Sequence, residues 1–277
     1  MNEESREKLE VLRAMIARTG PMAVAFSSGV DSTLLLKVAA DVLGGDVIAV
    51  TARSRSFPER ENREAAQFCR ELGVKQVCVD VDQLSIEGFR ENPPDRCYIC
   101  KKELFGAMIA AAKAHGFSKI AEGSNMDDLG DYRPGLRAIA ELGVMSPLRE
   151  AGLYKAQIRE ISRELGLPTW KKQSFACLAT RFVYGEHITD EKLERVDKAE
   201  QLLMDLGLGQ LRVRIHGEDG KLARIEVLPE EFEKLLACRE EIVRAFKQFG
   251  FEYTAMELGG YRTGSMNGNL GKTDKKE

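Results

Sequence analysis

The chain has 277 residues, of which 43% are hydrophobic and 31% are charged, and its formal net charge is -3. This length allows one large domain or two modest ones, and the slight negative charge excludes a broad cationic surface for long nucleic acids. No apolar run reaches the roughly 20 residues of a membrane-spanning helix, and the N-terminal MNEESREKLE is too charged for a signal peptide. We therefore expect a cytoplasmic protein, whose six cysteines suit metal binding or catalysis better than disulfides.

The first part of the chain alternates predicted helices and strands. After a polar-faced helix over residues 3–19, apolar runs and helix-ending glycines predict the order strand, helix, strand, helix, strand. These elements are strands at 22–27, 46–51 and 74–80 and helices at 31–44 and 59–73. The order is typical of a parallel sheet that helices cover.

The pattern continues with helices at 101–115 and 154–165 and a strand at 119–121, whereas the connections at 81–96 and 122–150 are long. After residue 186 it changes to a helix at 189–206, two alternating strands around Glu218-Asp219-Gly220, further helices and a strand in FEYTAM. We therefore predict an α/β domain over 1–186 and a smaller α+β domain over 187–277. The tail NGNLGKTDKKE is predicted to be disordered.

The stretch AFSSGVDSTLLLKVA, residues 25–39, joins the first strand of the predicted sheet to a helix. At such a turn the helix N-terminus and hydroxyls such as those of Ser27, Ser32 and Thr33 favour a phosphate or pyrophosphate. Asp31 would suit Mg²⁺ between phosphate oxygens, or it caps the helix as in a loop that binds nothing. The spacing fits neither the P-loop nor the dinucleotide fingerprint, but it resembles the SGGxDS signature of the PP-loop ATP pyrophosphatases. Ser28 stands in place of the first glycine, which costs on the order of 1 kcal/mol if that position requires a positive φ.

Three cysteines carry a second signal. Cys97 and Cys100 form a CxxC at the start of a predicted helix, a position that favours thiolates and directs both sulfurs to one side. Cys177 lies in the loop KKQSFACLATRFVYG, where Lys171, Lys172 and Arg181 are expected to favour a thiolate. Three thiolates suffice for a four-iron four-sulfur cluster with one open iron. A structural zinc with His187 as fourth ligand and a redox dithiol remain alternatives. The other cysteines, Cys69, Cys78 and Cys238, are expected to be small buried hydrophobic residues.

The chain is similar to the LarE family of ATP-dependent sulfur transferases, which are PP-loop proteins. The resemblance rests on AFSSGVDSTLLLKVA, on DYRPGLRA at 131–138, on CLATRFVYG at 177–185, on LRVRIHG with ARIEVLP at 211–229, and on LGGYRTGSMN at 258–267. It implies adenylation by MgATP of the carboxylates of a nicotinic-acid-derived biscarboxylic mononucleotide, followed by attack of sulfur, during synthesis of the nickel-pincer nucleotide. Because Cys97 and Cys100 accompany Cys177, the resemblance places the chain in the branch that uses a four-iron four-sulfur cluster.

The resemblance also implies the site residues. The segment Ser27, Ser28, Gly29, Val30, Asp31 and Ser32 would bind the ATP pyrophosphate, and Thr51, Arg53 and Gly123 would lie along the adenosine. Arg181, Arg212 and Arg214 would bind the substrate's anionic groups, and Glu200 and Glu226 a metal or the substrate. The alternatives are an exposed strand face for Arg212 and Arg214 and solvated surface charge for Glu200 and Glu226.

Charged residues near the motifs allow further expectations. Within DYRPGLRA, Asp131, Arg133 and Arg137 either clamp phosphates or anchor a lid by salt bridges, and Arg133 is the candidate that we keep for phosphate binding. Lys101 could neutralise ATP phosphates, whereas Trp170 is expected to pack rather than to stack on a base.

Three rival functions remain on sequence alone. A PP-loop tRNA 2-thiolation enzyme could also use three cysteines, although the net charge of -3 argues against it. An amide-forming PP-loop ligase would leave the cysteines idle, and a scaffold that binds a metal and a nucleotide would not be an enzyme. The resemblance further implies a homo-oligomer, a hexamer, with sulfide or another sulfur donor as co-substrate and no membrane or nucleic-acid partner.

Overall fold

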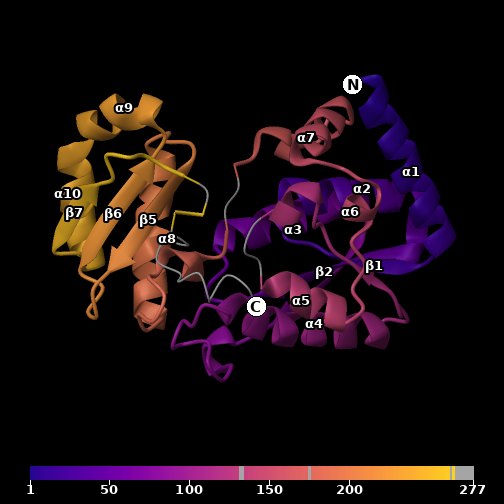
Figure 1. The fold of residues 1–277 in the computed structure, drawn as a ribbon, viewed down its shortest axis with the longest axis horizontal. Helices are drawn as coiled ribbons and strands as arrows, with labels where there is room; N and C mark the ends of the chain where they lie inside the picture. The colour runs from indigo at the N-terminus through magenta and orange to yellow at the C-terminus, as the bar shows by residue number, and fades with distance from the viewer. Residues whose placement is uncertain (131–133, 174–175, 263, 266–277) are drawn as a thin grey trace. The chain divides into compact units, whose positions relative to one another are not determined.

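A computed structural model describes residues 1–130, 134–173, 176–262 and 264–265 of the chain (Figure 1). The chain divides into two compact units. Met1–Val81 and Cys97–Ser174 make up the first unit, and Asp82–Arg96 and Phe175–Glu277 make up the second. The second unit therefore contains residues 82–96 in addition to the C-terminal part of the chain.

The first unit is built around a sheet of four parallel strands in the order β3-β2-β1-β4. The strands are β1 (Met22–Ala25), β2 (Val47–Arg53), β3 (Lys75–Asp80) and β4 (Ile120–Ala121). Ala25 pairs with Val50 of β2, and Val24 with Ala121 of β4, so the carboxyl ends of these three strands meet at one edge of the sheet. The prediction of an α/β fold with a parallel sheet is confirmed.

Helices cover both faces of this sheet, which explains why β1 and β2 are continuous apolar runs rather than alternating ones. Met22 and Val24 pack in one cluster with residues of the first three helices and of α6 and α7, whereas Ala23 and Ile48 pack against α4 and α5 on the other face. In Figure 1, α4 and α5 accordingly lie below the sheet, with α1 and α2 on the other side. The helices are α1 (Glu3–Thr19), α2 (Val30–Leu43), α3 (Glu59–Leu72), α4 (Arg96–Ala114), α5 (Gly135–Glu141), α6 (Pro147–Glu150) and α7 (Lys155–Glu164).

The long connection at 122–150 contains two short helices, α5 and α6, that the sequence pattern did not reveal. Both are too short for a clear 3.6-residue period, so only their packing distinguishes them from loops. Asp131 and Arg133 lie outside the described residues, as does the tail that was predicted to be disordered. Helix α4 begins at Arg96, and it therefore includes the CxxC in its first two turns.

In its described residues, the second unit contains a three-stranded sheet in the order β5-β6-β7 together with the α-helices α8, α9 and α10. Leu211 of β5 pairs with Val227 of β6 in an antiparallel hairpin, as predicted from the turn at Glu218-Asp219-Gly220, and β7 is parallel to β6. The elements are α8 (Asp190–Asp205), β5 (Leu211–His216), β6 (Leu222–Val227), α9 (Phe232–Ala237), α10 (Arg239–Phe249) and β7 (Tyr253–Met256).

The three cysteines outside the motifs differ in burial. Cys69 on α3 is 2% exposed, as predicted, and burial raises the pKa of its thiol to about 12, so this thiol stays protonated at neutral pH. The prediction was wrong for Cys78, which is exposed because β3 is an edge strand. It was also wrong for Cys238, which is only half-buried because it lies at the junction of α9 and α10.

Among the described residues, no helix is both long enough and apolar enough to cross a membrane.

Candidate active site

The turn between β1 and α2 has the backbone geometry of an anion-binding loop. Gly29 is the N-cap of α2 with an extended backbone (φ -73°, ψ 162°) and no side-chain cap, so no cap side chain occupies the N–H groups of the first turn. Ser28 has a φ of 54°, a left-handed conformation that serine adopts at a cost. The motif glycine that it replaces would adopt this φ without that cost. The loop therefore keeps the fold of its motif and leaves a helix N-terminus open to phosphate.

Hydroxyl groups line the same turn. The Ser27 and Ser32 Oγ atoms lie 3.3 Å apart, and Ser32 Oγ donates to the Gly29 carbonyl at 3.2 Å. Thr33 is fully buried, and its Oγ1 is among the buried side-chain atoms without a hydrogen-bond partner. Ser27 is exposed at the mouth of the turn, where it is able to meet a ligand.

Asp31 is held between two side chains that come from later parts of the first unit. Its Oδ1 accepts a hydrogen bond from Asn125 Nδ2 at 3.3 Å, and its Oδ2 forms an ion pair with Lys155 at the start of α7. Burial raises the pKa of the Asp31 carboxyl above its ordinary value, and the charge of Lys155 opposes this shift. The N-cap of α2 is Gly29, so Asp31 does not cap its own helix, and its carboxylate contacts Asn125 and Lys155 instead.

Gly123 follows β4 and lies against the first turn of α2. A Cβ placed there would be 3.0 Å from Ser32 N and 3.1 Å from Asp31 Cβ, closer than nine in ten real Cβ contacts. Glycine lets the chain pass this close to the loop without a shift of that turn. The close approach fits a nucleotide site at this edge of the sheet, although it also gives Gly123 a packing role.

Thr51 and Arg53 occupy the carboxyl end of β2, as predicted. Thr51 is buried, and its Oγ1 accepts from Gln76 Nε2 at 2.8 Å. Arg53 is half-exposed, and its guanidinium makes a bidentate pair with Asp80 at 2.9 and 2.8 Å. The parallel register thus brings Thr51, Arg53, Gly123 and the loop to one edge of the sheet, the usual place for a ligand in an open α/β sheet.

The CxxC lies in the first turns of α4, and α5 packs beside it. Tyr98 Oη donates to Glu141 at 2.7 Å, and the Arg137 guanidinium lies 4.0 Å from the centroid of the Tyr98 ring. A Cβ at Gly135 would be 2.6 Å from the Lys101 side chain and 3.3 Å from the Cys97 carbonyl. Segment 134–141 therefore anchors the CxxC turn, which favours the anchoring interpretation for Arg137.

Cys177 belongs to the second unit, where it precedes the short helix η5 (Leu178–Arg181). Within the described residues, no group of three or more His, Cys, Asp or Glu side chains is arranged to hold a metal ion. His187, the fourth ligand of the zinc alternative, is largely exposed, and its Nε2 lies 4.0 Å from Glu91 Oε1.

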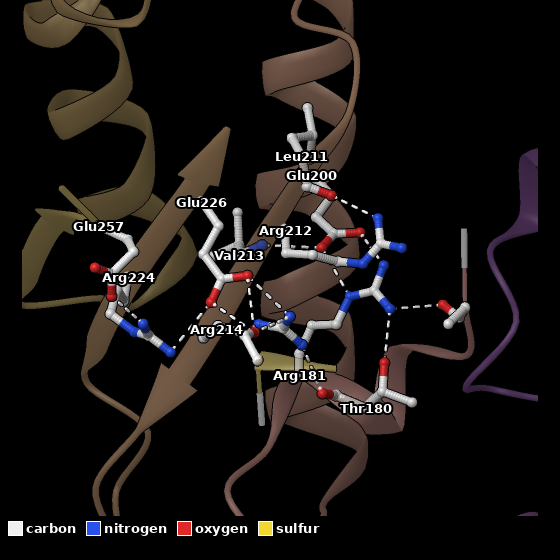
Figure 2. Close-up of polar contacts among 12 residues, drawn as sticks. Thr180, Arg181, Glu200, Leu211, Arg212, Val213, Arg214, Arg224, Glu226 and Glu257 are labelled. Atoms are coloured by element: carbon white, nitrogen blue, oxygen red, sulfur yellow. Dashed lines mark hydrogen bonds and ion pairs between the residues drawn. The ribbon is translucent and has the colours of Figure 1, made fainter. Parts of the chain in front are cut away.

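The second unit contains a buried network of arginines and glutamates (Figure 2). Arg181 and Glu200 of α8 are both fully buried and form a bidentate pair with two N–O distances of 2.8 Å. Arg181 also donates to the Ala176 and Cys177 carbonyls at 2.6 and 3.1 Å. This pair therefore fixes the backbone next to Cys177.

Arg212 and Arg214 on β5 extend the network. Arg214 donates to Glu226 at 2.8 Å, to the Thr180 carbonyl at 2.9 Å and to Ser265 at 3.0 Å. The guanidinium of Arg212 lies 5.2 Å from the centroid of the Tyr261 ring. Burial and the nearby Arg181 lower the pKa of Arg212 to about 10, which still leaves it charged at neutral pH.

The surface alternatives for these four residues were wrong. Arg212 and Arg214 are 4% and 5% exposed, and Glu200 and Glu226 are fully buried. Each glutamate is buried because an arginine supplies its counter-charge, Arg181 for Glu200 and Arg214 of the neighbouring strand for Glu226. Burial raises the pKa of Glu200, but the charge and hydrogen bonds of Arg181 outweigh this and hold it below the ordinary value.

Sequence reasoning missed the polar residues that support the loop from outside the motifs. These are Asn125, Lys155 and Lys172, together with Arg159, which holds the segment that carries Lys172. Only the long connection after β4 marked the region of Asn125, and nothing in the sequence distinguished Lys155 from surface residues. Lys172 was expected to favour a thiolate at Cys177, whereas its ammonium contacts Ser28 and Glu64.

Relatives of this chain include proteins that match nearly its whole length and proteins that match part of it. A pyridinium-3,5-bisthiocarboxylic acid mononucleotide synthase of Lactiplantibacillus plantarum is 38% identical over 252 residues, 91% of this chain and 90% of the relative. An uncharacterised protein of Synechocystis sp. is 42% identical over 267 residues, 96% of this chain and 98% of the relative. A subunit of the glutamine-hydrolysing GMP synthase of Archaeoglobus fulgidus is 26% identical over 202 residues, 67% of this chain and 65% of the relative. No protein-family model matches the chain.

The similarity to the GMP synthase subunit fits the parallel sheet and the loop at its carboxyl edge. The similarity to the mononucleotide synthase covers both compact units. The chain therefore belongs to the LarE family within the PP-loop ATP pyrophosphatases.

Proposed function

We propose that this protein is an ATP-dependent sulfur transferase that replaces the carboxylates of pyridinium-3,5-biscarboxylic acid mononucleotide with thiocarboxylates, in synthesis of the nickel-pincer nucleotide. The observation that carries the proposal is the 38% identity with the bisthiocarboxylic acid mononucleotide synthase, over 90% of that protein. The loop geometry supports the ATP half of the reaction, because an open helix N-terminus follows β1 at the carboxyl edge of the sheet.

The first unit would activate the substrate. The segment from Ser27 to Ser32 would bind the pyrophosphate of ATP through backbone N–H groups and hydroxyls, while Thr51, Arg53 and Gly123 flank the adenosine. Asp31, placed beside the loop by Asn125, has the oxygen ligands that Mg²⁺ prefers. The substrate carboxylate would attack the α-phosphate of ATP, and pyrophosphate would leave. The carboxylate oxygen, which is a poor leaving group, would then depart as part of AMP, which is a good one.

The second unit would recognise the substrate. Arg212 and Arg214 offer guanidinium groups to its phosphate or carboxylates, and Glu226 keeps Arg214 in place. Arg181 and Glu200 are already committed to each other and to the backbone at residues 176 and 177. We therefore assign them the positioning of the Cys177 loop, and we assign substrate binding to the domain predicted over residues 187–277.

Cys97, Cys100 and Cys177 would hold a four-iron four-sulfur cluster, which would carry the extra sulfide that replaces AMP, with sulfide or another sulfur donor as the co-substrate that restores it. The donor chemistry fits, since three free cysteines are available and two of them are three residues apart at the start of a helix. The Tyr98 and Gly135 contacts would keep the first two thiolates in a fixed direction. We also propose that the enzyme works in the cytoplasm as a homo-oligomer.

Anaerobically purified protein tests this function with ATP and the biscarboxylic mononucleotide. We expect AMP and pyrophosphate in equal amounts, only when the mononucleotide is present, and mass spectrometry should show oxygen replaced by sulfur. Iron and sulfide analysis of Cys97→Ala, Cys100→Ala and Cys177→Ala should show loss of the cluster. AMP release that is indifferent to the mononucleotide would contradict the substrate assignment, and stoichiometric zinc in a colourless protein would contradict the cluster.

A further inference from the structure

Lys172 lies outside the loop motif, and it contacts the ATP loop at Ser28, the residue with a positive φ. Lys172 Nζ donates to the Ser28 carbonyl at 3.0 Å and to the Ser28 Oγ at 3.2 Å, and it forms an ion pair with Glu64 on α3. An ammonium group has three N–H donors, and all three of these acceptors belong to the protein. Lys172 is thus committed to the loop and α3 rather than directed at a ligand.

The segment that carries Lys172 is itself fixed by α7. Arg159 donates to the Trp170 carbonyl at 2.6 Å and to the Lys172 carbonyl at 2.8 Å. The Lys172 side chain is only 16% exposed, so its ammonium is partly removed from water and its hydrogen bonds are correspondingly stronger. Because its backbone is held by Arg159 and its ammonium by Ser28 and Glu64, the Lys172 side chain restrains Ser28.

Ser28 is the residue that needs such restraint. Its φ of 54° is unfavourable for a residue with a Cβ, and the motif has glycine at this position. Its side chain is buried at 2% exposure, and its Oγ donates to the Glu61 carbonyl of α3 at 3.2 Å. The same oxygen accepts from Lys172, so the hydroxyl makes contacts that a glycine could not make.

We propose that Lys172 is a positioning residue of the ATP loop, which holds Ser28 in its left-handed conformation and so keeps the loop open to the pyrophosphate of ATP. The motif glycine adopts this conformation without support, whereas here the hydrogen bonds of Lys172 and of the Ser28 hydroxyl stabilise it. The proposal rests on the proposed ATP-dependent function, and it adds a residue that acts through Ser28 rather than on ATP.

Direct binding of ATP and AMP by calorimetry tests the proposal without the mononucleotide, so its failure is distinct from failure of the proposed function. Lys172→Met removes the ammonium at nearly constant length, and it should weaken ATP binding about tenfold, the loss typical of a hydrogen bond that involves a charged group. AMP lacks the pyrophosphate, so its affinity should stay unchanged. A variant that was merely misfolded would lose both nucleotides.

Ser28→Gly distinguishes the indirect role from a direct contact with ATP. Glycine reaches a positive φ unaided, so in the Ser28→Gly background Lys172→Met should weaken ATP binding by no more than about threefold. The effects of the two substitutions would then be non-additive in a double-mutant cycle. Lys171→Met is the matched control, because Lys171 is exposed with its Nζ 4.6 Å from the Trp170 ring centroid, and it should bind ATP like the wild type. Equal weakening by Lys172→Met in the wild-type and Ser28→Gly backgrounds would overturn the proposal, as would unchanged ATP affinity in the wild-type background.

Discussion

The two units place their charged side chains in opposite ways. In the first unit, backbone N–H groups and hydroxyls form the candidate ligand site, and Lys155 and Lys172 contact that loop without being fully buried. In the second unit, Arg181 and Glu200 are fully buried and satisfied by each other before any ligand arrives. The comparison shows that a phosphate loop depends on backbone shape, whereas the buried network depends on matched charges.

This difference predicts the largest effect for a change in the buried pair. Arg181→Met or Glu200→Leu leaves one charge buried without its partner, which should lower the free energy of unfolding by about 3–5 kcal/mol. The double variant should lose less than the sum of the two single variants, because neither charge is then left alone. Urea denaturation measures this, and strictly additive losses would contradict the pairing.

Backbone shape in the first unit is tested by Gly123→Ala. The new Cβ would be 3.0 Å from Ser32 N, so we expect a loss of stability of about 1–3 kcal/mol from overpacking, with weaker ATP binding. Gly45→Ala is the matched control, since a Cβ at Gly45 meets no atom within 4 Å and its φ is not positive. Thermal unfolding and calorimetry with ATP check both variants, and similar behaviour of the two would show that the close approach is unimportant.

A smaller effect is expected from His216 as pH changes. Burial, followed by the charge of Arg224, lowers the pKa of His216 from its ordinary 6.5, and its Nε2 accepts from Arg224 at 3.1 Å. The folded protein thus keeps His216 neutral while the unfolded chain takes up a proton, so this stabilisation is present above pH 6.5 and is lost as pH falls through the lowered value. Urea midpoints between about pH 7.5 and pH 5 should fall less steeply for His216→Gln than for the wild type; parallel slopes would exclude His216 as the cause.

The smallest effect should come from an exposed pair in the same unit as Arg181 and Glu200. Lys221 and Glu252 form an ion pair with side chains that are 45% and 55% exposed, and water and salt screen such pairs. Glu252→Gln should leave the urea midpoint of the second unit unchanged within error. A loss comparable to that of Glu200→Leu would show that burial does not separate the two kinds of ion pair.

Features of the first unit that are encoded locally could be predicted from the sequence, whereas the buried ion pairs of the second unit could not. The loop from Ser27 to Ser32 and its flanking strand and helix could be predicted, because their signals are local in sequence. The burial of Glu200 could not be predicted, because its partner Arg181 lies 19 residues away and charge alone favours the surface. Cys78 was misjudged for a related reason, since an apolar run does not reveal that its strand is at the edge of the sheet.

Lys172 shows a further limit of the sequence. It contacts a residue 144 positions away, and neither periodicity nor spacing marks it. The replacement of a motif glycine by Ser28 did indicate strain at that position, but only the folded structure shows which side chains hold it.

The most direct test of the central claim is the release of AMP and pyrophosphate from ATP, measured anaerobically with and without the biscarboxylic mononucleotide. We predict release that depends on the mononucleotide, accompanied by sulfur in the product. Release at the same rate without the mononucleotide, or a product that contains no sulfur, would contradict the assignment.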